Sequence, residues 1–138
     1  MCELIYPLIT RASRPPHPRA SMPFRSVASR ELADVFSVLA HPHRLRIVEE
    51  IGAGELDVAS ISELLAISHS GASQHLAQLR AHRLVTERRD GRRVFYRLRN
   101  PDLAQWLLAG LSLLEADADA SLEIKSSLRR ARAAWSST

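Results

Sequence analysis

The sequence predicts a mostly α-helical fold with a small β-hairpin, and three observations lead to this prediction. Apolar residues recur at helical spacing through most of residues 30–138. One stretch, residues 84–98, instead has the pattern of two strands around Asp90-Gly91, a strong signal for a hairpin turn. The length of 138 residues and a hydrophobic share of 46% suit one folded domain with a tail.

The N-terminal segment, residues 1–29, differs from the rest in composition. It holds five of the seven prolines, several arginines and serines, and no persistent apolar period. We therefore expect a flexible basic arm. The arm lacks the apolar stretch of a secretory signal, and no apolar run in the chain approaches the roughly 18 residues that a membrane-spanning helix needs. We expect a cytoplasmic protein that does not enter membranes.

The first two helices are separated by a proline. Leu32 and Phe36 have helical spacing, and Pro42 ends the helix to which they belong. Pro42 also suits the first turn of a second helix, which we expect to end at Gly52.

Two shorter helices follow. The run Ser60-Ile61-Ser62-Glu63 predicts a capping box at the start of the third helix. After a turn at Ile67-Ser68, a fourth helix is expected to run to about His82, with Ser68 or Ser70 as its N-cap. Its buried stripe is expected to comprise Ala72, Leu76 and Leu79.

The C-terminal part, residues 101–138, is expected to form one long helix or two, with a break near residues 117–121. An apolar stripe runs along it, formed by Leu103, Trp106, Leu107, Leu111 and Leu114. These side chains exceed what a small core can cover, so we expect them to lie in a dimer interface. The expected plan is an arm over residues 1–29, a core domain over 30–100 and dimerisation helices over 101–138.

Basic residues are concentrated in one segment, and almost all are arginine. Eighteen of the 19 basic residues are Arg, which binds phosphate and guanine through a planar pair of donors. Residues 80–99 hold eight arginines against Glu87 and Asp90, which predicts a phosphate-binding surface. A solvated charged face is the alternative interpretation of this segment.

The order of the elements predicts a winged helix-turn-helix. The third and fourth helices with their short turn match a helix-turn-helix, and the hairpin that follows matches a wing. In such a unit the second helix lies in the major groove of DNA. The fourth helix suits that position because it carries short polar side chains and because residues 68–86 contain no acid. The candidate DNA-binding residues are Ser70, Gly71, Ser73, Gln74, Gln78, Arg80, Arg88, Arg89, Arg92 and Arg93.

Two other classes of function fit the sequence less well. No glycine-rich phosphate loop, nucleophile elbow or pair of carboxylates in an apolar setting is present, so we do not expect an enzyme. A winged helix that binds only protein would favour an acidic or apolar outer face on the fourth helix, and residues 70–81 show neither. The alternative interpretation of the fourth helix is an ordinary solvated helix. The alternative interpretation of the hairpin is a charged β-ribbon whose arginines keep its exposed edge from pairing with another strand.

Four stretches resemble the ArsR/SmtB family of winged-helix repressors, in the order and with the gaps typical of that family. They are FSVLAHPHRLRI (36–47), ISELL (61–65), SGASQHLAQLR (70–80) and GRRVFYRL (91–98). The resemblance implies a homodimeric repressor that binds an imperfect double-stranded DNA palindrome and releases it when an effector is sensed. It also implies helical dimerisation elements at both ends, which adds Leu32 and Phe36 to the interface. His75 matches a family histidine with a structural or DNA-contacting role, and Arg83 stands where the family usually has Gly.

The residues of the family's usual metal sites are missing. Residues 55–60, which match its thiol site, contain no Cys, and no His follows His82 to supply the site between the last helices. The matching positions of that second site are Asp102, Ala104, Glu115 and Ala118. We therefore expect no metal or other cofactor, and the sequence does not identify an effector. An alternative is a metal- or redox-responsive repressor that uses Cys2 and His17 of the arm.

Overall fold

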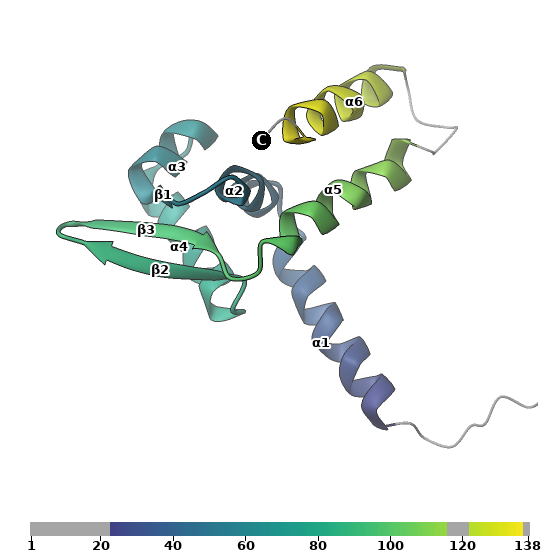
Figure 1. Cartoon of the computed structure of the whole chain (residues 1–138), viewed down its shortest axis with the longest axis horizontal. Helices are drawn as coiled ribbons and strands as arrows, with labels where there is room; N and C mark the ends of the chain where they lie inside the picture. The colour runs from purple at the N-terminus through teal and green to yellow at the C-terminus, as the bar shows by residue number, and fades with distance from the viewer. Residues whose placement is uncertain (1–22, 116–121, 137–138) are drawn as a thin grey trace, which may run out of the picture.

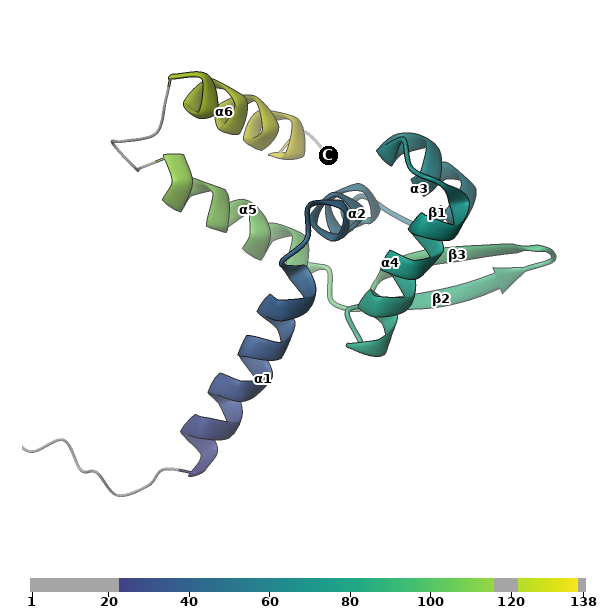
Figure 2. The ribbon, with the colours of Figure 1, turned by 180° about the vertical axis from the view of Figure 1, so that it is seen from behind.

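The computed structural model describes residues 23–115 and 122–136, and it confirms the mostly helical class with a small β-sheet (Figure 1). In chain order the elements are α1 (Pro23–Leu39), α2 (Pro42–Gly52), β1 (Leu56–Asp57), α3 (Val58–Leu65), α4 (His69–Ala81), β2 (Val85–Asp90), β3 (Arg93–Leu98), α5 (Asp102–Glu115) and α6 (Leu122–Ser136). Helix α1 and the β2–β3 hairpin project from the body in different directions in both Figure 1 and Figure 2.

Helix α1 begins earlier than the sequence suggested. It starts at Pro23, so the expectation of an irregular arm is wrong for residues 23–29, while residues 1–22 lie outside the described part of the chain. Proline fits the first turn of a helix, and neither Gly nor another Pro interrupts the segment before Leu39. The apolar side chains of Phe24 and Val27 are exposed, so this part of α1 is helical without burying its apolar residues in the core.

The hydrophobic core surrounds α2. Its buried side chains come from every helix through α5 and from both long strands, namely Val38, Leu39, Ile47, Val48, Ile51, Ile61, Ala72, Leu76, Leu79, Val85, Leu98 and Ala104. His41 is the N-cap of α2, and its Nδ1 accepts a hydrogen bond from the backbone N–H of His43 at 3.1 Å. At the other end, a Cβ on Gly52 would lie 2.9 Å from the Cβ of Ala104, so glycine allows α5 to approach α2 closely.

Helix α3 begins at Val58 with Asp57 as its N-cap, so the expected capping box at Ser60 is wrong. The Asp57 carboxylate accepts a hydrogen bond from the backbone N–H of Ser60 at 3.0 Å. Aspartate is as effective an N-cap as serine, and Asp57 also joins a strand to the helix. The helix ends at Ala66, which adopts a left-handed conformation with φ of 53°.

The sheet has three antiparallel strands in the order β1-β3-β2 rather than the two of a simple hairpin. Strand β1 pairs with β3 through Leu56 opposite Tyr96 and Asp57 opposite Phe95. In the hairpin Asp90 pairs with Arg93, so the two-residue loop is Gly91-Arg92, one position later than the Asp-Gly signal suggested. Gly91 has φ of +59°, a conformation that side chains disfavour and glycine adopts readily.

Helix α4 ends in a left-handed residue at Arg83, which has φ of +59°. The backbone N–H of Arg83 donates to the carbonyl of Arg80, and that of Leu84 donates to the carbonyl of Leu79. This pair of bonds is the Schellman arrangement, in which glycine is the usual residue at the left-handed position. The helix therefore ends in the geometry that a glycine at this position would favour, although the residue is arginine.

The described part of the C-terminal region contains two helices, which agrees with the expectation of two helices rather than with that of one long helix. Helices α5 and α6 contact one another and lie side by side in both views (Figures 1 and 2). The expected break falls at residues 116–121, which lie outside the described residues. Among the helices described, none is long and apolar enough to cross a membrane.

Candidate DNA-binding surface

Helices α3 and α4 form the helix-turn-helix around a tightly buried contact. Ile61 of α3 and Ala72 and Leu76 of α4 are completely shielded from solvent. The Ser68 hydroxyl caps α4 by accepting a hydrogen bond from the backbone N–H of Gly71 at 3.0 Å. A Cβ on Gly71 would lie only 3.0 Å from this hydroxyl oxygen, so the glycine leaves room for the cap. Local capping therefore explains Gly71 without reference to DNA.

The predicted buried stripe of α4 is confirmed, and its outer face is polar. Ser70, Gln74, Gln78 and Arg80 are exposed, whereas Ser73 is half-buried. No acidic residue occurs in this helix. The face therefore presents hydrogen-bonding groups without a negative charge, which suits contact with a polyanion.

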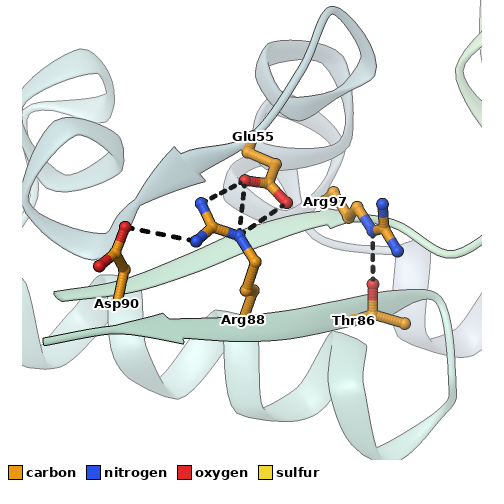
Figure 3. Close-up of polar contacts among 5 residues, drawn as sticks. All are labelled: Glu55, Thr86, Arg88, Asp90 and Arg97. Carbon is orange, nitrogen blue, oxygen red and sulfur yellow. Dashed lines mark hydrogen bonds and ion pairs between the residues drawn. The ribbon is translucent and has the colours of Figure 1, made fainter.

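Two arginines of the wing, Arg88 and Arg93, are bound by carboxylates of the β1 region. Figure 3 shows the contacts of Arg88. Arg88 forms an ion pair with Glu55 at 2.9 Å and a longer one with Asp90 at 3.4 Å. Arg93 forms an ion pair with Asp57 at 2.6 Å. Both guanidinium groups also lie over the Phe95 ring, at 4.9 and 5.0 Å from its centre. These contacts hold Arg88 and Arg93 against the sheet.

The arginines at the tip of the wing differ from this bound pair. Arg89 and Arg92 are exposed, and within residues 23–115 and 122–136 neither forms an ion pair. On α4, Arg80 pairs with Glu87 of β2 at 2.6 Å. Within the basic segment of residues 80–99, Arg80, Arg88 and Arg93 are thus paired with carboxylates. Arg89 and Arg92 at the tip form no ion pair among the described residues, and neither do Arg83, Arg97 and Arg99.

The partner carboxylates stay charged at neutral pH. Hydrogen bonds from Ser60, followed by the contact with Arg93, lower the pKa of Asp57 to about 2. The hydrogen bonds from Arg88 lower the pKa of Glu55. Sequence reasoning missed both partners because the two-residue strand β1 carries no visible period, and the pairing with β3 is what brings them to the wing.

A cluster of three histidines connects the start of α2 with α4, the candidate recognition helix. The rings of His41, His43 and His75 have centres 4.5 to 5.3 Å apart, and one ligand nitrogen from each lies within 4.8 Å of the others. Burial is the largest cause that lowers the pKa of His41 and of His75, with Arg44 and the other imidazoles adding to it. Neutral imidazoles at this spacing could hold a transition-metal ion. The cluster could not be predicted from the sequence, because His75 is 32 residues from His43.

An apolar face spans α1 and α5. The Phe36 and Trp106 rings lie 5.3 Å apart, and Trp106 remains 42% exposed. The expected interface residues divide into the exposed Leu32, Phe36, Trp106 and Leu114, the half-buried Leu111, and Leu103 and Leu107, which pack against the core. Leu113, which the sequence analysis did not single out, is 76% exposed and lines an apolar hollow with Phe36 and Trp106.

Comparison with known proteins gives consistent matches. A helix-turn-helix domain model matches residues 39–88. The nodulation protein NolR of Rhizobium meliloti is 33% identical over 98 residues, which cover 71% of this chain and 80% of that protein. A transcriptional repressor SmtB homolog of Synechocystis is 40% identical over 70 residues, which cover 51% of this chain and 53% of that protein, so the chain spans about half of that relative.

A solved structure shares the architecture. It is the homodimeric winged helix-turn-helix DNA-binding domain of a possible ArsR-family transcriptional regulator from Mycobacterium bovis. The match has a TM-score of 0.60 and 28% identity, and covers 70% of this chain and 91% of that one. The relatives are transcriptional regulators rather than enzymes, in agreement with the sequence analysis. Taken with the helix-turn-helix, the acid-free face of α4 and the basic wing, these matches show that the chain belongs to the ArsR/SmtB family of DNA-binding transcriptional regulators.

Proposed function

We propose that this protein is a homodimeric repressor that places α4 in the major groove of an imperfect palindrome and the wing on the flanking backbone. The observation that carries the proposal is the polar, acid-free outer face of α4 beside the unpaired arginines Arg89 and Arg92. Phosphate attracts such a surface, and a helix of this width fits the major groove.

The side chains take different roles in this proposal. Gln74 and Gln78 are long enough to make paired hydrogen bonds with adenine edges. Ser70 and Ser73 lie near the start of α4 and donate to phosphates from their hydroxyls, whereas Gly71 takes part only through the cap, because its N–H is bound by Ser68. The half-buried His75 supports the helix. Arg89 and Arg92 bind the backbone or enter a minor groove. Arg80, Arg88 and Arg93 reach phosphate only by sharing or releasing the carboxylates that now hold them.

Dimerisation is proposed through the apolar face of α1 and α5. Leu32, Phe36, Trp106 and Leu114 expose large apolar side chains on these helices. A second copy is the occupant favoured by the homodimeric state of the Mycobacterium bovis domain. Two copies related by a twofold axis present two α4 helices, which is why the proposed operator is a palindrome.

The family's usual metal sites are not used in this proposal. At the position of the thiol site, Asp57 already caps α3 and binds Arg93. At the second site, Ala104 is only 7% exposed and packs in the core, so it offers neither a ligand nor space. Of the other positions matched to that site, Ala118 lies outside the described residues, as do Cys2 and His17 of the alternative arm site.

The test is binding to duplex DNA selected from the source genome, measured by fluorescence anisotropy at several salt concentrations. Arg92→Ala is expected to weaken binding to all duplexes and to lower the salt slope by about one. Gln74→Ala is expected to cost about 1–3 kcal/mol of preference for the selected site over random DNA. Arg129→Ala on α6 removes the same charge away from this surface and serves as the control.

Two results would refute the proposed surface. One is that Gln74→Ala and Arg92→Ala bind both kinds of duplex as the parent protein does. The other is that Arg129→Ala weakens binding as much as Arg92→Ala, which would mean that net charge rather than the wing determines affinity.

A further inference from the structure

We propose that His41, His43 and His75 form a binding site for a divalent transition-metal ion of the Zn²⁺, Co²⁺ or Ni²⁺ class. This location differs from both of the positions that the resemblance assigns to metal in this family. Among the described residues, the three histidines are the one group of metal-ligating side chains whose donor atoms converge. Two come from the junction of α1 and α2, and the third comes from the candidate recognition helix.

The spacing of the donors fits tetrahedral coordination. His43 Nδ1 and His75 Nε2 lie 3.3 Å apart. Two imidazole nitrogens bound to one tetrahedral zinc at 2.0–2.1 Å are separated by about 3.3 Å. All three donors lie within 4.8 Å of one another, so His41 completes the set by a small side-chain rotation. The fourth position is open to water, as in sites with three histidine ligands.

Two of the histidines, His41 and His75, are in the protonation state that metals require. A metal binds the lone pair of a neutral imidazole, and the lowered pKa of His41 and of His75 keeps both neutral at pH 7. Arg44 contributes to both shifts. Its guanidinium is held by the Val38 carbonyl, through a hydrogen bond from Nε. The same positive charge opposes a dication, so the site is expected to bind less tightly than a site that contains carboxylates.

The site is reachable from solvent. All three histidines are half-buried rather than enclosed, and His75 lines an open hollow with Arg44, Gln74, Ala77 and Gln78. Binding at His41 replaces the cap of α2, because Nδ1 either becomes the ligand or carries the remaining proton. Loss of one N-cap hydrogen bond is a small cost beside the binding energy of a three-histidine site.

The competing occupant of the cluster is a proton. The 3.3 Å contact between His43 and His75 is also that of a weak hydrogen bond, in which one ring donates and the other accepts. A cluster that holds only this proton would show no metal-dependent signal, so metal titration separates the two interpretations.

The experiment is a titration of the full-length, metal-free protein with Co²⁺ in the absence of DNA, followed by visible absorption. We expect one Co²⁺ per chain with the intense visible bands of tetrahedral cobalt, and displacement of Co²⁺ by Zn²⁺. His43→Gln and His75→Gln are each expected to weaken binding at least about tenfold. His41→Asn, which retains a capping side chain, is expected to weaken it similarly. The controls His69→Gln and His82→Gln alter histidines at the two ends of α4 and are expected to bind as the parent does.

A double variant, Cys2→Ser with His17→Gln, removes the donors of the arm and is expected to retain full Co²⁺ binding. Loss of binding in this variant would place the metal in the arm and overturn the proposal. Absence of cobalt bands in the parent, or unchanged binding in both His43→Gln and His75→Gln, would also overturn it. If a variant fails to fold by circular dichroism, paramagnetic broadening of the imidazole resonances in the parent protein decides the question: broadening confined to His69 or His82 refutes the site. Because no DNA is present, failure of the proposed operator binding leaves this test intact.

Discussion

At the scale of single residues, short polar contacts decide where helices begin and end. Asp57 is the clearest example, because one carboxylate caps α3 and also holds Arg93 of the wing. Arg83 is the opposite case, since it adopts a left-handed backbone conformation that normally favours glycine although it carries a side chain. Each residue gives a prediction that a matched pair of substitutions tests.

Two substitutions of Asp57 are expected to separate the stabilisation due to its N-cap hydrogen bond from that due to its negative charge. Asp57→Ala removes both and is expected to lower the free energy of unfolding by about 1–2 kcal/mol, whereas Asp57→Asn retains a capping side chain and is expected to cost less. The folded pKa of about 2 is below the ordinary 3.8, so the charge stabilises the fold above about pH 4. That contribution is lost as the pH falls from 4 to 2.

Urea unfolding at several pH values measures both effects. The parent is expected to lose stability between pH 4 and 2 more steeply than Asp57→Asn. Parallel pH profiles for the two proteins would show that the Asp57 charge does not stabilise the fold.

Arg83→Gly is expected to raise the free energy of unfolding by about 0.5–1 kcal/mol, because relief of the left-handed conformation exceeds the entropic cost of glycine in the unfolded chain. Arg83→Ala removes the same charge but keeps the Cβ, so no comparable gain is expected. Thermal unfolding of the three proteins provides the comparison. An equal gain in both variants would assign the effect to the charge rather than to the backbone.

At the scale of elements, the β2–β3 wing is held to the body by strand β1 as well as by the ends of its own two strands. Strand β1 adds to the sheet and brings Glu55 and Asp57 to the arginines of β2 and β3. In the proposed complex with DNA, these carboxylates compete with phosphate for the same guanidinium groups. The number of arginines available to DNA would then be set by β1 as well as by the hairpin.

Removal of one competing carboxylate is expected to strengthen DNA binding. Glu55→Gln removes the shorter of the two ion pairs of Arg88, so affinity for duplex DNA is expected to rise and the salt slope to steepen by up to about one. Glu123→Gln on α6 makes the same change in net charge and is the control. Fluorescence anisotropy over a salt series measures the slope, and equal effects of the two variants would rule out a specific role for the Glu55–Arg88 pair.

At the scale of the whole molecule, the core accounts for only part of the apolar surface. Leu103 and Leu107 pack inward, while Phe36, Trp106 and Leu113 remain accessible across α1 and α5. A second copy of the chain is the proposed cover for this face. Because Leu103 and Leu107 contribute to the core, their substitution would also destabilise the monomer. A substitution of the exposed Leu113 tests the dimer alone.

Leu113→Asp is expected to shift the protein from dimer to monomer and to weaken operator binding in parallel, because a charge at this exposed position is tolerated in the monomer but not in an apolar interface. Analytical ultracentrifugation at micromolar concentration measures the shift. Leu64→Asp places the same charge on α3 and is expected to leave the protein dimeric. A monomeric parent protein would contradict the proposed interface, and so would a Leu113→Asp variant that remains fully dimeric.

The sequence alone determined the order of helices, the buried stripe of α4 and the basic hairpin, because local periodicity, capping and turn residues act over a few positions along the chain. It misplaced the start of α1 and the cap of α3, where exposed apolar residues and a short strand gave weak or competing signals. Only the tertiary structure decided which arginines are paired and which histidines converge. The contacts of Arg88 with Glu55, Arg93 with Asp57 and His43 with His75 join residues more than 30 positions apart. Strand pairing and helix packing bring these residues together without any trace in local sequence.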